Sequence, residues 1–204
     1  MICGFGIYDG EKGKASNKNI IYKFWSSMVE RCYSEKMQKK NPTYIGITVC
    51  DDWKRYSNFE KWANKHYISG YELDKDIITI NSKIYSPETC SFVPSIVNSC
   101  ILDKETDTMY PIGVSFMKER NGYLRPKPYR ATISCYGKVK HLGSFSTQEE
   151  AHLCWQQAKC EYIIDLIKIY KNLDSNVIAG LQRRIDILKN DINLKAITYS
   201  INKV

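Results

Sequence analysis

The chain has 204 residues, of which 43% are hydrophobic and 25% are charged. This composition is typical of a globular protein with one substantial core or two small ones. No apolar run approaches the roughly 18 to 20 residues of a membrane-spanning helix, and the N-terminus lacks the basic start and apolar stretch of a secretory signal. We therefore expect a cytoplasmic protein with no membrane partner, whose oligomeric state the sequence does not predict.

Positive charge is concentrated in one part of the chain. Lysine and arginine exceed aspartate and glutamate by 30 to 22, which gives a net charge of +8. Between Tyr110 and Leu142 there are seven basic residues and one acidic residue, Glu119. The seven are Lys118, Arg120, Arg125, Lys127, Arg130, Lys138 and Lys140. A solvated basic surface is one interpretation, but such a cluster favours a polyanionic partner, most commonly nucleic acid.

The eight cysteines form no CxxC pair. In a protein that we expect in the cytosol, this argues against a disulfide framework and favours buried thiols. A structural Zn²⁺ is a second interpretation, for which the spacing is irregular. Its candidate ligands are Cys32, Cys50, Cys90 and Cys100.

The periodicities predict an α+β protein in three segments, the first of which covers residues 1–104. Its expected elements are a helix at 19–33, a strand at 47–50, a helix capped by Asp51, a hairpin over 72–93 and a helical turn from Pro94. The aromatic and aliphatic residues of the two longer helices repeat at helical spacing, which is typical of a core. The polar stretch 102–109 is the expected linker to the second segment.

The second segment, residues 105–172, predicts a three-stranded antiparallel sheet packed on one long helix. The strands are "PIGVSFM", "YRATISCY" and "KVKHLGSF", and the helix begins near Ser146, which fits a capping box with Glu149. A single helix covers one face of such a sheet, so the other face must meet solvent or a ligand. The third segment, residues 173–204, predicts a C-terminal helix that packs back on the protein or, as the alternative, forms a dimer seam.

Alternate side chains of a strand share one face, which makes one face of this sheet polar. In the second strand, the outward residues are Arg130, Thr132, Ser134 and Tyr136. In the third strand, Lys138 and Lys140 share a face, and we expect it to be the same outward face. Basic and hydroxyl groups suit phosphate oxygens and base edges, whereas a solvated edge sheet is the alternative.

The stretch "IGVSF … YRATISCYGKVKHLGSFSTQEEAHLCWQQAK" resembles the plant ethylene-response-factor type (AP2-like) of DNA-binding domain. The specific part is the run from Gly137 to Ala151, and such domains recur in phage and mobile-element nucleases. The resemblance implies that the sheet lies in the major groove of double-stranded DNA, although the arginine and tryptophan base readers of that family are not matched one for one. Together with the basic stretch, it gives as candidate DNA contacts Arg120, Arg125, Lys127, Arg130, Lys138, Lys140 and His141.

The stretches "FWSSMVERCY", "YIGITVCDDWKRYSNFEKW", "LDKDI" and "YSPETCSFVPSIVN" resemble phage homing endonucleases of the HNH (ββα-metal) class. That class implies one Mg²⁺ on the scissile phosphate and a general base that activates water. By the resemblance, Asp74 and Asn98 are metal ligands and Lys75 occupies the position of the base. Asp76 is a further catalytic candidate, Thr89 stands at the position of the middle asparagine, and all three histidines lie outside the hairpin.

Two functions follow from this combination of segments. In the first, Asp74 and Asn98 hold Mg²⁺, Lys75 binds the phosphate, and the protein cleaves or nicks DNA as an endonuclease of phage or mobile-element origin. In the second, the Asp-Lys-Asp triplet is structural and the protein is a non-enzymatic DNA-binding or host-takeover regulator. A third class, a protein that inhibits another protein, predicts no DNA affinity.

Overall fold

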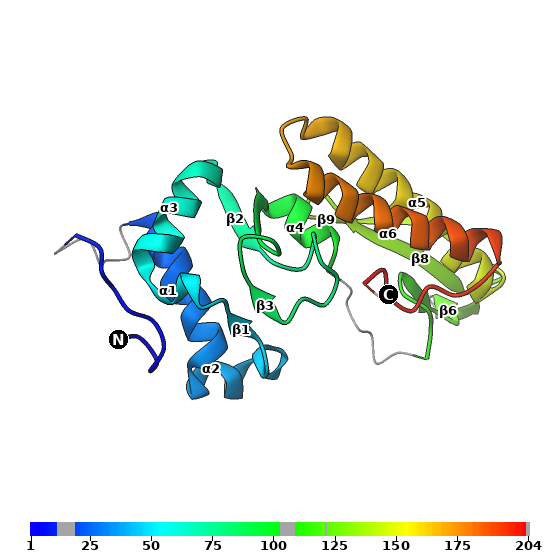
Figure 1. The fold of residues 1–204 in the computed structure, drawn as a ribbon. Helices are drawn as coiled ribbons and strands as arrows, with labels where there is room; N and C mark the ends of the chain where they lie inside the picture. The colour runs from blue at the N-terminus through cyan, green and yellow to red at the C-terminus, as the bar shows by residue number, and fades with distance from the viewer. Residues whose placement is uncertain (12–18, 103–108, 121, 203–204) are drawn as a thin grey trace. The chain divides into compact units, whose positions relative to one another are not determined.

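The computed structural model describes residues 1–11, 19–102, 109–120 and 122–202. The chain divides into two compact units, Met1–Pro94 and Ser95–Val204 (Figure 1). Helices and small sheets occur in both units, which confirms the predicted α+β class. Most of the predicted linker lies outside the described residues.

The first unit combines three helices with two pairs of short strands. Its helices are α1 (Ile20–Tyr33), α2 (Glu35–Lys40) and α3 (Tyr56–His66), with 3-10 turns at Pro42–Tyr44 and Asp52–Lys54. Its strands are β1 (Thr48–Val49), β2 (Tyr71–Asp74), β3 (Ile84–Tyr85) and β4 (Ser91–Pro94). Strands β1 and β3 pair in parallel, and β2 and β4 pair antiparallel as the base of the predicted hairpin.

An aromatic core holds α1 against α3 in this unit. The predicted apolar stripe of α1 is confirmed, because Ile21, Trp25, Met28 and Cys32 are all buried. The indole Nε1 of Trp25 donates a hydrogen bond of 2.8 Å to the carbonyl of Trp53, which is also fully buried. Burying each large apolar side chain contributes about 1.5–3 kcal/mol, so this stripe is a main source of stability for the unit.

The prediction that Asp51 caps the second long helix is wrong. After a 3-10 turn, α3 begins only at Tyr56. Its first turn is instead capped by Asp9, whose Oδ1 accepts from the backbone N–H of Ser57 and whose Oδ2 accepts from the Ser57 hydroxyl, both at 2.9 Å. A helix N–H group that is usually capped by a residue next to it in the sequence is thus capped by a carboxylate 48 residues upstream.

The second unit is a three-stranded sheet covered by helices on one face. Its elements are α4 (Ser95–Cys100), β5 (Val114–Phe116), β6 (Glu119–Arg120), β7 (Tyr123–Leu124), β8 (Tyr129–Cys135), β9 (Lys138–Phe145), α5 (Gln148–Ile169) and α6 (Ser175–Asn193). The sheet order is β5-β8-β9, all antiparallel, as predicted. Strands β6 and β7 form a small separate hairpin, where the sequence indicated only a turn.

Helix α5 packs on this sheet, and α6 packs on α5 (Figure 1). The prediction that the C-terminal helix packs back on the protein is confirmed, because its apolar stripe is buried. The predicted capping box of α5 is shifted by one residue. Thr147, not Ser146, accepts the N–H of Glu150 at 3.2 Å, and the Glu150 carboxylate accepts the N–H of Thr147 at 3.4 Å. The shift arises because β9 stays extended through Phe145 and the chain needs two residues to turn.

A one-residue irregularity interrupts the pairing of β8 with β9. The register pairs Ala131 with Gly143 but Thr132 with His141, so Leu142 is the extra residue of a β-bulge. Residues that pair across an antiparallel ladder point to the same face of the sheet. A shift of one residue therefore inverts the faces of all the β9 residues on the turn side of the bulge.

The prediction that Lys138 and Lys140 share the outward face with Arg130 is wrong for this reason. Lys140 pairs with Ile133 and Lys138 pairs with Cys135, so both lysines point to the side that carries the buried Ile133. They are exposed, because β9 is an edge strand and its end extends to the hairpin turn. Lysines on an edge strand also discourage pairing with other chains, which is a structural role.

A buried histidine of α5 connects segments near the two ends of the second unit. His152 is 2% exposed, its Nδ1 lies 3.0 Å from the carbonyl oxygen of Ile112, and its Nε2 accepts the N–H of Thr198 at 2.9 Å. Because the Thr198 amide can only donate, Nδ1 carries the proton and the imidazole is neutral. Burial lowers the pKa of His152 below its ordinary value of 6.5.

We predict that the free energy of unfolding falls as the pH drops below 6.5. Because the pKa of His152 is lower in the folded chain, the unfolded chain binds a proton at a higher pH than the folded chain does. The stabilising contribution of the neutral imidazole is therefore complete above pH 6.5 and is lost as the pH falls below it. The change His152→Asn removes a titrating group and should flatten this slope. Urea unfolding at about pH 7.5 and about pH 5.5 measures it, and an unchanged slope in the variant would contradict the assignment.

Candidate nucleic-acid interface

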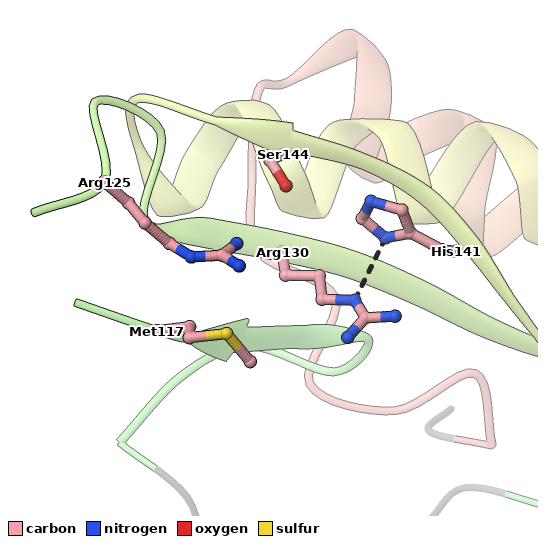
Figure 2. Close-up of a pocket in the computed structure, with 5 residues that line it drawn as sticks. All are labelled: Met117, Arg125, Arg130, His141 and Ser144. Atoms are coloured by element: carbon pink, nitrogen blue, oxygen red, sulfur yellow. Dashed lines mark hydrogen bonds between the residues drawn. The ribbon is translucent and has the colours of Figure 1, made fainter. Parts of the chain in front are cut away.

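The face of the sheet opposite α5, which we term the outer face, carries an open groove. The residues of the outer face are Ser115, Arg130, Thr132, Ser134, Val139, His141 and Ser144, as the strand register shows. The groove has a volume of about 490 Å³ and is lined by Met117, Arg125, Arg130, His141 and Ser144 (Figure 2). It therefore combines basic and hydroxyl side chains from β8, β9 and the loops that flank the sheet.

Arg130 is held in this groove by a histidine on the neighbouring strand. Its Nε donates a hydrogen bond of 3.1 Å to Nδ1 of His141 (Figure 2). The same Nδ1 lies 3.2 Å from the carbonyl oxygen of Ala131, but it cannot donate to that oxygen while it accepts from the guanidinium. Since an arginine N–H only donates, Nδ1 is the acceptor in this bond. The histidine thus orients the guanidinium without neutralising it.

Arg125 reaches the groove from the β6–β7 hairpin. Its backbone N–H donates to the carbonyl of Lys118 at 2.9 Å, which fixes the base of the hairpin. Its side-chain Nε is buried and has no hydrogen-bond partner among the described residues. A buried unsatisfied donor costs about 1–3 kcal/mol, and more when it is charged, so an acceptor that enters the groove would be stabilised.

Carboxylates do not neutralise the two arginines of the groove within the described part of the chain. The ion pairs there join Arg55 to Asp9, Lys75 to Asp76 and Lys168 to Asp165. The groove therefore keeps the charge of both guanidinium groups, which is the arrangement that phosphate oxygens require.

The other predicted DNA contacts are distributed more widely. Lys127 is exposed between β7 and β8, and Lys138 and Lys140 are exposed on the opposite side of β9. Of Arg120, only the backbone belongs to the described structure, in β6. The sequence interpretation did not find Ser144, which pairs with Arg130 across β8 and β9 and so shares its face of the sheet.

The HNH-like hairpin uses its first aspartate to hold the backbone together. Asp74 ends β2 and is 8% exposed. Its Oδ2 accepts hydrogen bonds from the backbone N–H groups of Asp76, at 2.8 Å, and Ile77, at 2.7 Å. Burial raises the pKa of this carboxyl group, although the bond from Ile77 acts in the opposite direction. The geometry is that of a capped turn.

The residues at the other two HNH positions of this unit are also engaged internally. Lys75 is 6% exposed, and its Nζ donates to Oδ1 of Asp76 at 2.6 Å and to the carbonyl of Ser82 at 2.9 Å. Nζ thus acts as a donor to two acceptors, whereas a general base must accept a proton. Thr89 donates from Oγ1 to the carbonyl of Ile84 at 2.8 Å and so stabilises the loop before β4.

These side chains do not fit a Mg²⁺ site. One oxygen of Asp74 already accepts two N–H groups, and Asp76 is paired with Lys75. Mg²⁺ needs oxygen ligands in nearly octahedral geometry, and a neighbouring ammonium group opposes its binding. In the described ranges, no group of three or more His, Cys, Asp or Glu side chains is placed to hold a metal ion.

The cysteines proposed as zinc ligands are mostly buried thiols. Burial raises the pKa of Cys32 and of Cys90 to about 12, whereas the metal ligand is the thiolate. Cys50 is half-buried, and Cys100 belongs to the second unit. All eight cysteines are free thiols. A structural Zn²⁺ therefore stays a prediction without a ligand cluster among the described residues.

Comparison of the chain with protein-family models, with curated proteins and with solved structures finds no match. Both family resemblances therefore rest on the sequence motifs alone. Within the described residues, the structure contains no helix whose length and apolar character would let it cross a membrane.

We predict that Asp74→Ala lowers the free energy of unfolding of the first unit by about 1–3 kcal/mol, because two buried N–H groups lose their acceptor. The matched control is Asp51→Ala, an exposed aspartate of the same unit, which should change stability by less than about 0.5 kcal/mol. Urea unfolding followed by tryptophan fluorescence measures both variants. If Asp74→Ala is as stable as wild type, the aspartate is not a structural cap.

Proposed function

We propose that this chain is a DNA-binding protein that places the outer face of its second unit on the backbone of double-stranded DNA. We further propose that its HNH-like hairpin is a structural element rather than a cleavage site, so that the protein acts as a non-enzymatic DNA-binding regulator. The observation that carries the first part is the convergence of Arg125, Arg130, His141 and Ser144 on one groove.

Charge and shape both support a nucleic-acid partner for this face. Guanidinium groups bind phosphate oxygens through charge-assisted hydrogen bonds, and hydroxyl groups add neutral donors. The net charge of +8 attracts a polyanion from a distance, and the stretch from Tyr110 to Leu142 in the same unit holds seven basic residues against one acidic residue. The major groove of B-DNA, about 12 Å wide, accepts an antiparallel β-ribbon.

The internal contacts of the hairpin support the absence of cleavage. Hydrolysis of a phosphodiester needs a group that accepts a proton from water and a cation that stabilises the leaving oxygen. The side chain at the base position is Lys75, a buried ammonium paired with Asp76. The carboxylate of Asp74 serves two backbone N–H groups. Asp74 and Lys75 are thus engaged in holding the loop.

We predict that Arg130→Ala weakens binding to a double-stranded oligonucleotide by about tenfold or more, because a charge-assisted bond to phosphate is lost. The matched control is Lys140→Ala, which removes an exposed positive charge from the adjacent strand but from the other side of the sheet. This control should change the affinity by less than about threefold. Fluorescence anisotropy with a labelled duplex measures both, and a larger loss in Lys140→Ala would contradict the assignment of the outer face.

We also predict no metal-dependent nicking by the wild-type protein. Supercoiled plasmid is incubated with protein and Mg²⁺ or Mn²⁺, and the relaxed product is compared with that formed by Asp74→Asn, which keeps the shape of the side chain. We expect the two samples to contain equal amounts of relaxed plasmid, no more than forms without protein. Nicking that appears in wild type and is lost in the variant would establish the endonuclease and overturn the structural interpretation of the hairpin.

A further inference from the structure

We infer that the groove lined by Arg125, Arg130, His141 and Ser144 binds a terminal phosphate monoester of DNA, as found at a nick or a strand end, in preference to an internal phosphodiester. This inference rests on the proposed DNA-binding function and specifies which part of the DNA enters the groove. It follows from the charge of the groove, from its supply of hydrogen-bond donors and from its boundaries.

The charge of the groove matches a dianion. Arg125 and Arg130 contribute two positive charges, and the Nε of Arg130 donates to Nδ1 of His141. Within the described residues, neither guanidinium has a carboxylate in an ion pair. A phosphate monoester carries about −1.5 to −2 charges at pH 7, whereas an internal phosphodiester carries one. The monoester therefore neutralises both arginines, and the diester leaves one of them unbalanced.

The supply of donors also exceeds what a diester can use. A guanidinium has five N–H donors, and Arg130 uses its Nε for His141. Arg125 brings a buried Nε with no partner among the described residues, and Ser144 brings a hydroxyl group. A monoester presents three terminal oxygens, one for each of these side chains. A diester has two non-bridging oxygens, so that two of the three side chains would share one oxygen.

The groove is lined by side chains from several segments. Arg130 lies on β8, His141 and Ser144 lie on β9, and Met117 follows β5. Arg125 extends over the sheet from the β6–β7 hairpin (Figure 2). An internal phosphate must bring the nucleic-acid chain into the groove on both sides, whereas a terminal phosphate enters on a single ester bond. A strand end therefore brings less of the nucleic-acid chain into the groove than an internal phosphate does.

The test compares three duplexes of one sequence by fluorescence anisotropy. One is intact, one has a central nick with a 5′-phosphate, and one has the same nick with a 5′-hydroxyl. We expect the phosphorylated nick to bind about tenfold tighter than the other two, which corresponds to one additional charge-assisted interaction. A nick changes the flexibility of the duplex, and the 5′-hydroxyl form controls for that change.

Arg125→Ala should abolish the preference for the phosphorylated nick, so that this variant binds the three duplexes with equal affinity. Arg125→Lys, which keeps the charge but not the planar donor fork, should retain part of the preference. Lys140→Ala, on the other side of the sheet, should retain all of it. Thermal unfolding of each variant tests whether the second unit is still folded.

The outcomes separate this inference from the proposed function. Equal affinity for the three duplexes overturns the terminal-phosphate site and leaves DNA binding intact. Absence of affinity for all three overturns both. A deoxynucleoside 5′-monophosphate that competes at the same concentration as the phosphorylated nicked duplex would assign the groove to a free nucleotide. That result would overturn the choice of a DNA end. Weak competition by the monophosphate and by inorganic phosphate is the expected result.

Discussion

The antiparallel pairing of β8 with β9 is the interaction on which the second unit depends. It is closed by a tight turn in which Tyr136 and Gly137 both have positive φ, the geometry that matches the twist of a two-stranded ribbon. On one side of the pair, the small Ala131 allows α5 to pack closely on the sheet. On the other side, the bulge at Leu142 brings His141 to the face of Arg130. The pairing of β8 with β9 thus forms both the surface on which α5 packs and the groove on the opposite face.

In the first unit, buried polar side chains hold the backbone together at positions where a similar hairpin would carry catalytic groups. The chain between β2 and β4 is long and has little regular structure, so its backbone groups need partners. Asp74, Lys75 and Thr89 supply them through bonds to backbone N–H and carbonyl groups. A motif can therefore keep the outline of a catalytic hairpin while its side chains hold the loop together.

Periodicity predicted the elements well because it reports burial directly. The stripe of α1 and the alternation of β8 follow from which residues avoid water, and both are confirmed. The predicted cap of α3 failed because the acceptor is Asp9, which is distant in the sequence. The faces of Lys138 and Lys140 were wrong because alternation assumes an unbroken ladder, and a single bulge reverses it. The groove was foreseen only in part, since Arg125 and Ser144 meet Arg130 through the tertiary fold.

The salt dependence of DNA binding tests the role of the outer face most directly. Each phosphate that the protein neutralises releases counterions, so the logarithm of the affinity falls linearly with the logarithm of the salt concentration. We expect Arg125→Ala and Arg130→Ala each to reduce the magnitude of that slope by about one, and Lys140→Ala to leave it unchanged. Slopes that do not change in the two arginine variants, or that change only in Lys140→Ala, would contradict the assignment of this face to DNA.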